Sequence, residues 1–124
     1  MNRASALAVL SILWIVPFGA LHAAAPAAER ERIEELIRSV ERLPNAKFIR
    51  NGASYDARAA ADHLRLKLRE AGDRVRTAED FIRLCGSKSS VSGNPYRMRF
   101  DDGTLVTSEA FLRAKLKELD APGK

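Results

Sequence analysis

Hydroxyl side chains gather in one short segment, residues 87–96, which reads Ser-Lys-Ser-Ser-Val-Ser-Gly-Asn-Pro-Tyr. Its serine hydroxyls and the backbone N–H groups of a tight Ser-Gly turn could donate several hydrogen bonds to an anion or a sugar. Arg97 and Arg99, on one face of the strand that follows, could add charge-assisted bonds to a carboxylate or phosphate. The alternative is that the hydroxyls satisfy the backbone of the loop itself, as serine commonly does. The candidate ligand- or partner-binding residues are Ser87, Ser89, Ser90, Ser92, Gly93, Tyr96, Arg97 and Arg99.

A serine in this loop needs a neighbouring base to act as a nucleophile, and Lys88 stands between Ser87 and Ser89. Adjacent side chains in an extended loop point apart, and neither the S-x-x-K pattern nor the G-x-S-x-G elbow is present. His63 lies in a helical pattern, where we expect it to border the apolar stripe or to face solvent. The sequence therefore predicts no catalytic residue and no enzyme, with a loop-serine hydrolase as the competing hypothesis.

Metal and cofactor sites are disfavoured by the small number of ligating side chains. Beyond residue 25 the chain has one histidine and one cysteine, too few for the usual nitrogen and sulfur shell. Residues 101–103, Asp-Asp-Gly, suit a turn and lack the spaced oxygen ligands of a calcium loop. With no glycine-rich phosphate loop present either, we expect no metal and no cofactor.

A more specific alternative comes from Ser92-Gly93-Asn94-Pro95-Tyr96. This stretch is similar to the S-G-x-x-Y loop of the periplasmic lysozyme inhibitors, where such a loop enters the cleft of the enzyme. Those inhibitors are largely β, whereas this chain is mostly helical in pattern. The resemblance implies lysozyme inhibition as an alternative function.

Helical patterns and two hairpin signals surround the loop. Apolar residues at spacings of three and four, with the caps that precede them, predict helices over residues 29–43, 57–71, 77–85 and 108–119. The expected N-caps are Asp56, Thr77 and Ser108.

Asn51-Gly52, between short strand-like flanks, is the strongest short-range signal for a hairpin. A second hairpin is predicted around residues 101–103, after the alternating segment 96–100. Because an isolated hairpin is marginally stable, we expect the two to pair into one antiparallel sheet. The predicted fold is α+β, a small single domain of about four helices packed on two antiparallel hairpins over residues 29–119, followed by a flexible tail, residues 120–124.

The N-terminus has the three parts of a secretory signal peptide: a short basic head with Arg3, an apolar run from Ala4 to Leu21, and small residues up to Ala28. We predict a signal peptide over residues 1–25, cut between residues 23 and 27, with an uncleaved membrane anchor as the alternative. The protein is then periplasmic, with no stable membrane insertion after cleavage.

The charge pattern disfavours one class of partner, and the single cysteine indicates a buried side chain. The whole chain has a net charge of +5, and Arg3 is the one charged residue of the predicted signal peptide, so the exported chain has a net charge of +4. Its basic residues alternate with acidic ones, as on solvated helix faces, which disfavours nucleic acid as a partner. Cys85 is alone among apolar neighbours, which favours a buried position over a reactive thiol.

Several motifs in order and spacing carry a resemblance to a known family. They are Phe48-Ile49-Arg50-Asn51-Gly52, Tyr55, His63-Leu64-Arg65, Lys67-Leu68, Thr77-Ala78-Glu79, Phe81-Ile82, Ser89-Ser90, Ser92-Gly93, Pro95-Tyr96 and Asp102-Gly103. The chain resembles the YfeK-like family of small exported proteobacterial proteins, a domain of unknown function, from about Glu31 to Leu116. The resemblance implies an exported bacterial protein of a single domain and brings no established activity.

The leading functional hypothesis is a small exported, non-enzymatic module that binds an envelope ligand or protein partner through the loop 87–96. Single-domain size, the missing catalytic constellation and the polar loop all favour it over the hydrolase and the lysozyme inhibitor.

Overall fold

The computed structural model describes residues 25–123. The predicted signal peptide therefore lies outside the described residues apart from Ala25, and its cleavage stays a prediction. Within the described range, no helix combines the length and apolar character needed to cross a membrane.

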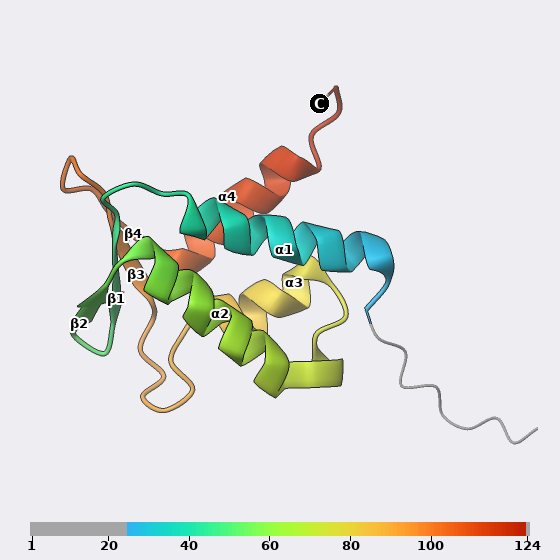
Figure 1. Ribbon diagram of the computed structural model, residues 1–124, viewed down its shortest axis with the longest axis horizontal. Coiled ribbons are helices and arrows are strands. Elements are labelled where there is room, and N and C mark those ends of the chain that lie inside the picture. Colours follow the sequence, from blue (N-terminus) through green and yellow to red (C-terminus); the bar gives the residue numbers. More distant parts are fainter. Residues whose placement is uncertain (1–24, 124) are drawn as a thin grey trace, which may run out of the picture.

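Helices and strands follow one another as the sequence pattern predicts, and the α+β fold is confirmed (Figure 1). In chain order the elements are α1 (Ala27–Glu41), β1 (Lys47–Arg50), β2 (Ala53–Tyr55), α2 (Ala57–Ala71), the 3₁₀ turn η1 (Gly72–Arg74), α3 (Ala78–Phe81), the π-helical turn η2 (Ile82–Gly86), β3 (Arg97–Arg99), β4 (Leu105–Thr107) and α4 (Ser108–Leu119).

The two hairpins pair through β1 and β3 into one four-stranded antiparallel sheet of order β2-β1-β3-β4, as expected. Phe48 pairs with both Tyr55 and Met98, and Met98 pairs with Val106, so these four side chains share one face. That face turns toward the helices and the core, whereas Arg97 and Arg99 are exposed on the other face.

The core lies between the helices and the inner face of the sheet. In Figure 1 the strands form a wall at one end of the domain, and α1, α2 and α4 extend from it. Several core side chains have no exposed surface: Leu36, Ile37, Ala61, Ala78, Phe81, Ile82, Cys85, Met98 and Leu112. The buried position predicted for Cys85 is confirmed.

The third helix differs from the prediction of one regular helix over residues 77–85. The α-helix ends at Phe81 and the chain continues as the wider π-helical turn η2. The hydroxyl of Ser87 donates to the carbonyl of Ile82 at 2.6 Å, which satisfies an acceptor at this end of the helix. Gly86 packs so closely on α4 that a Cβ there would lie 2.4 Å from Cδ1 of Leu112.

Two of the three expected N-caps are confirmed. The carboxylate of Asp56 accepts from the N–H of Ala59, and the hydroxyl of Thr77 accepts from the N–H of Asp80. The prediction for Ser108 is wrong, because Thr107 is the cap of α4. Strand β4 runs directly into α4, so the residue that ends the strand, with extended backbone, is the one that caps the helix.

Candidate functional site

The serines of the loop 87–96 mainly hold the loop itself together. Backbone bonds join Ser89 N to Asn94 O at 3.0 Å and Gly93 N to Ser89 O at 2.9 Å. The hydroxyl of Ser89 accepts from the N–H groups of Val91 and Ser92, both at 3.3 Å, and its residue is 4 % exposed. Ser89 therefore stabilises the conformation of the loop.

Asn51 ties the loop to the β1–β2 hairpin. Its amide nitrogen donates to the Ser89 hydroxyl at 3.2 Å, and its amide oxygen accepts from the Ser92 hydroxyl. Asn51 has a φ of 50° and Gly52 a φ of 79°, so the turn predicted from Asn-Gly is the structure that aims this amide at the loop.

The structure does not bring the sequence-predicted site residues together on one surface. Ser90 and Val91 are exposed, and Val91 is 95 % accessible. Arg97 and Arg99 lie on the outer face of β3, while Tyr96, one position earlier, is buried on the inner side. Strand alternation sends neighbouring side chains to opposite faces, which separates the two arginines from Tyr96.

Lys67 lies beneath the loop 87–96 and bonds to it, although it is not among the binding residues that the sequence predicts. Its side chain on α2 is 7 % exposed, and its Nζ donates to the carbonyl of Lys88 at 2.9 Å and to Oη of Tyr96 at 3.0 Å. The signal in the sequence is its position: Leu64, Lys67 and Ala71 follow the spacing of the buried stripe, so a cation falls where an apolar residue is the rule.

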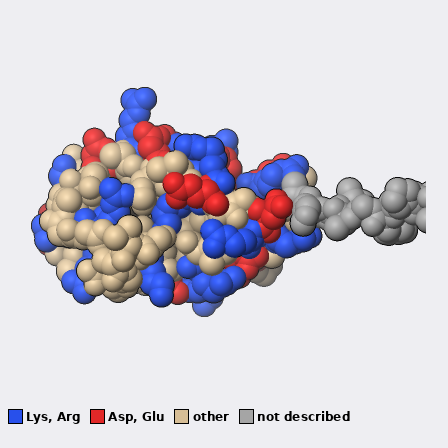
Figure 2. All heavy atoms as spheres, turned by 90° about the horizontal axis from the view of Figure 1, so that it is seen from below, with Lys and Arg blue, Asp and Glu red and all other residues tan. Residues whose placement is uncertain are grey.

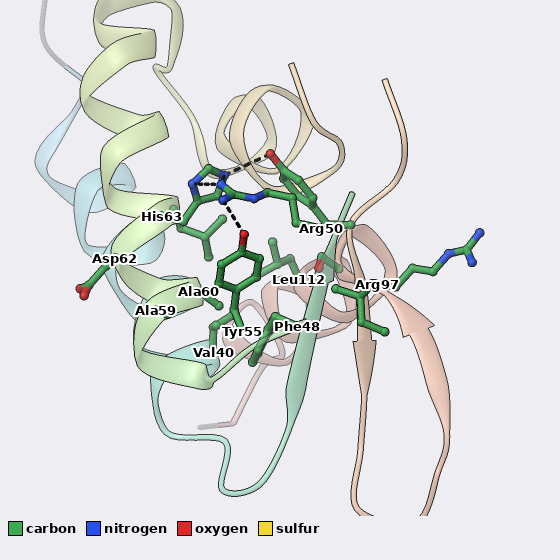
Figure 3. Close-up of a pocket in the computed structure, with 14 residues that line it drawn as sticks. Val40, Phe48, Arg50, Tyr55, Ala59, Ala60, Asp62, His63, Arg97 and Leu112 are labelled. Carbon is green, nitrogen blue, oxygen red and sulfur yellow. Dashed lines mark hydrogen bonds between the residues drawn. The ribbon is translucent and has the colours of Figure 1, made fainter. Parts of the chain in front are cut away.

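His63 lies within hydrogen-bond distance of both Arg50 and Tyr96, and Figure 3 shows its contact with Arg50. Nη1 of Arg50 lies 2.6 Å from Nδ1 of His63 and 3.0 Å from Nε2. A guanidinium only donates, so we assign the nearer Nδ1 as the acceptor and place the imidazole proton on Nε2. That N–H then donates to Oη of Tyr96 at 3.2 Å, and Nη2 of Arg50 donates to Oη of Tyr55 at 3.1 Å.

The electrostatic environment of this cluster is positive. Burial lowers the pKa of His63, and the charges of Arg50 and Lys67 lower it further, while Glu70 acts in the opposite direction. Among residues 25–123, no carboxylate lies within 4.0 Å of the charged groups of Lys67 or Arg50. Donors also exceed acceptors here: Lys67 has three N–H groups for two acceptors, and Tyr96 accepts from two donors.

These groups line a polar cleft of about 480 Å³ between α2, the β1–β2 hairpin and the loop. Glu70 is the one acid among the residues that line it, which are Arg50, Asn51, Ala53, Tyr55, His63, Leu66, Lys67, Glu70, Ser89, Ser90, Val91 and Tyr96. An adjoining recess of about 300 Å³ lies between α2 and the inner face of the sheet and shares Arg50, Tyr55, His63 and Tyr96 with the cleft. Both volumes fall in the range of small-ligand sites.

The cleft offers no pairing of a serine hydroxyl with a basic nitrogen. In the part of the chain that the structure describes, no serine hydroxyl is hydrogen-bonded to the side chain of His63, Lys67 or Lys88. Across the same residues, no three His, Cys, Asp or Glu side chains are grouped as metal ligands would be. Cys85 is a buried core side chain, and this burial raises the pKa of its thiol.

Charged residues are mixed on the face shown in Figure 2, where Lys and Arg stand beside Asp and Glu over much of the surface. Several charged residues of the described chain form ion pairs within or between helices, such as Arg65 with Glu34 and Glu41. Lys67 differs from these residues because it is buried and has no carboxylate within 4.0 Å among residues 25–123.

A model of a family of unknown function, DUF5329, matches residues 27–120. The chain belongs to this family. The matched range of this DUF5329 chain runs from the start of α1 past the end of α4 and so includes the cleft and the recess.

The chain is also similar to the uncharacterized protein YfeK of Salmonella typhimurium, with 39% identity over 70 residues. The aligned part covers 56% of this chain and 58% of the relative, so the chain spans a little over half the length of the curated protein it matches. The resemblance to the YfeK-like family is thereby confirmed. No solved structure matches this DUF5329 chain.

Proposed function

We propose that this protein is an exported, non-enzymatic binding module of the periplasm, and that its polar cleft holds a small anion or the anionic group of a larger ligand. The observation that supports this most directly is Lys67. The residue is 7 % exposed and lines the cleft, and its ammonium has one N–H group beyond its two acceptors. A buried cation without a counter-charge is unfavourable, and a bound anion would relieve that cost.

Arg50 supplies a second cation to the same cleft, and the Tyr96 hydroxyl supplies a neutral donor. With Nε2–H of His63 and Nζ of Lys67 both donating to Oη, the hydroxyl proton of Tyr96 is left for an acceptor in the cleft. A carboxylate or phosphate has the acceptor oxygens to match donors of this kind.

The two alternative functions have less support. A loop-serine hydrolase needs a free base, and His63 contacts Arg50 and Tyr96 through its ring nitrogens. Lysozyme inhibition through Ser92-Gly93-x-x-Tyr96 needs the loop to present its tyrosine, and the side chain of Tyr96 is 8 % exposed beneath the loop.

The test is thermal unfolding in acetate, phosphate and sulfate, each compared with chloride at matched ionic strength. A bound anion raises Tm in a saturable way, because ligand that binds only the folded state stabilises it. Lys67→Met removes a charge-assisted hydrogen bond, so we expect the affinity for the favoured anion to fall about tenfold or more.

Two further variants make the test decisive. Arg50→Gln removes the other cation of the cleft while Lys67 keeps its bond to the loop, and we expect it to weaken binding as well. Arg99→Gln is the matched control, since it removes an exposed arginine from the outer face of the same sheet and should bind as wild type does. Equal anion responses from all four proteins, or no response from the wild type, contradict the proposal.

A further inference from the structure

We infer that the ligand is an amphiphile, whose anionic head lies at Lys67 and Arg50 and whose apolar chain enters the recess between α2 and the sheet. This inference rests on the proposed function and adds the chemical class of the ligand: a carboxylate or phosphate that has an alkyl chain of medium length.

The wall of the recess is apolar. Val40, Phe48, Ala60, Leu64 and Leu112 line it, and these side chains come from α1, β1, α2 and α4. Asp62 and Arg97 also border the recess, but their side chains point away from it (Figure 3). An apolar space of this kind favours an apolar occupant over water, which needs two to four polar partners.

The recess is partly open to solvent, and its volume of about 300 Å³ is at the lower end of the range of small-ligand sites. At ~30 Å³ for a water-sized group, the recess has room for roughly ten such groups, which is enough for the eight carbons of octanoate.

The polar and apolar spaces meet at one boundary, which orients the ligand. Arg50, Tyr55, His63 and Tyr96 line both the cleft and the recess, and Figure 3 shows Arg50 reaching across to His63 above the ring of Tyr55. An amphiphile whose head binds Arg50 on the cleft side would reach the recess across this shared boundary, past Arg50 and Tyr55.

The experiment is a calorimetric titration with acetate, butyrate, hexanoate and octanoate below micelle formation. Each methylene that enters the recess should tighten Kd about fourfold, which corresponds to ~0.8 kcal/mol per CH₂. Octanol tests the chain without the charge and should bind more weakly than octanoate. Octyl phosphate, compared with inorganic phosphate, makes the same test with a phosphate head group. A lower Kd for the longer chain with either head group supports the inference.

Ala60→Leu fills the recess from α2, and Ala114→Leu makes the same change at an exposed position of α4. We expect Ala60→Leu to bind octanoate no more tightly than acetate and Ala114→Leu to behave as wild type. If wild type binds acetate and octanoate equally and Lys67→Met binds neither, the inference is overturned while the proposed function stands. If octanoate binds equally to wild type, Lys67→Met and Arg50→Gln, the two cations do not hold its head group, and the proposed function fails together with this inference. If acetate, phosphate or sulfate binds to wild type but neither octanoate nor octyl phosphate does, this inference alone is overturned, and if none of these anions binds, both fail.

Discussion

His63 lies half-buried between two cations, and this position lowers its pKa below the ordinary value of ~6.5. Between the folded-state pKa and ~6.5 the unfolded chain binds more protons than the folded one, so the free energy of unfolding falls as the pH drops through that window. The loss begins near pH 6.5 and levels off below the folded-state pKa.

We therefore predict that His63→Gln loses less stability than wild type when the pH is lowered from about 7 to about 5. Calorimetric melting curves over this range provide the measurement. Parallel curves for the two proteins would show that Arg50, Lys67 and the burial of the ring do not disfavour the imidazolium.

Asn51 allows its turn geometry and its contacts to the loop to be separated. Asn51→Gly keeps a residue that readily adopts positive φ but loses both amide bonds, so we expect a loss of about 1–2 kcal/mol. Asn51→Ala should cost about 1 kcal/mol more, because its Cβ disfavours the left-handed conformation. Urea unfolding measures both.

Hydrogen exchange at Ser89 and Gly93, whose N–H groups close the loop, reports the same contact locally. We expect faster exchange at both amides in Asn51→Gly. Unchanged exchange would mean that the serine bonds hold the loop without the hairpin.

At the scale of single residues, the sequence predicts the Asn-Gly turn but not the hydrogen bonds of Asn51 to the loop 87–96. The serine cluster marks the correct loop, yet its hydroxyls bond within the loop and to Asn51. Lys67 could be noticed as a cation in an apolar stripe, but its partners, Lys88 and Tyr96, lie 21 and 29 residues away and are set by tertiary packing. No local pattern encodes such a contact.

At the scale of elements, periodicity and caps predict α2 in full, from Ala57 to Ala71. Helix α1 lies two residues earlier at both ends than the predicted 29–43. The π-helical turn η2 is not predicted, and its last residue, Gly86, packs closely on Leu112 of α4, a tertiary contact that no local pattern encodes.

Gly86→Ala tests that packing. Its Cβ would collide with Cδ1 of Leu112, a buried side chain that would have to shift, so we expect a destabilisation of about 1–3 kcal/mol. In a Leu112→Val background the colliding atom is absent, and the added cost of the alanine should largely disappear. A penalty that stays the same in both backgrounds would place its origin in the backbone of the turn.

At the scale of the whole molecule, the α+β class and the single antiparallel sheet follow from two hairpin signals and four helical patterns. The cleft and the recess could not be predicted from these patterns, because each is formed by elements that are distant in sequence. Family membership agrees with the resemblance in the motifs and covers every described element, from Ala27 to Asp120.

The most direct test of the proposed anion site in the polar cleft is an NMR titration of the ¹⁵N-labelled chain, without its predicted signal peptide, with acetate, observing the backbone amides and the Arg50 side-chain N–H. We predict saturable shifts that are concentrated on Arg50, Lys67, Ser89 and Tyr96 and absent at Arg99 on the outer face. Shifts that fail to saturate, or that are as large at Arg99 as at Arg50, would contradict an anion site in this cleft.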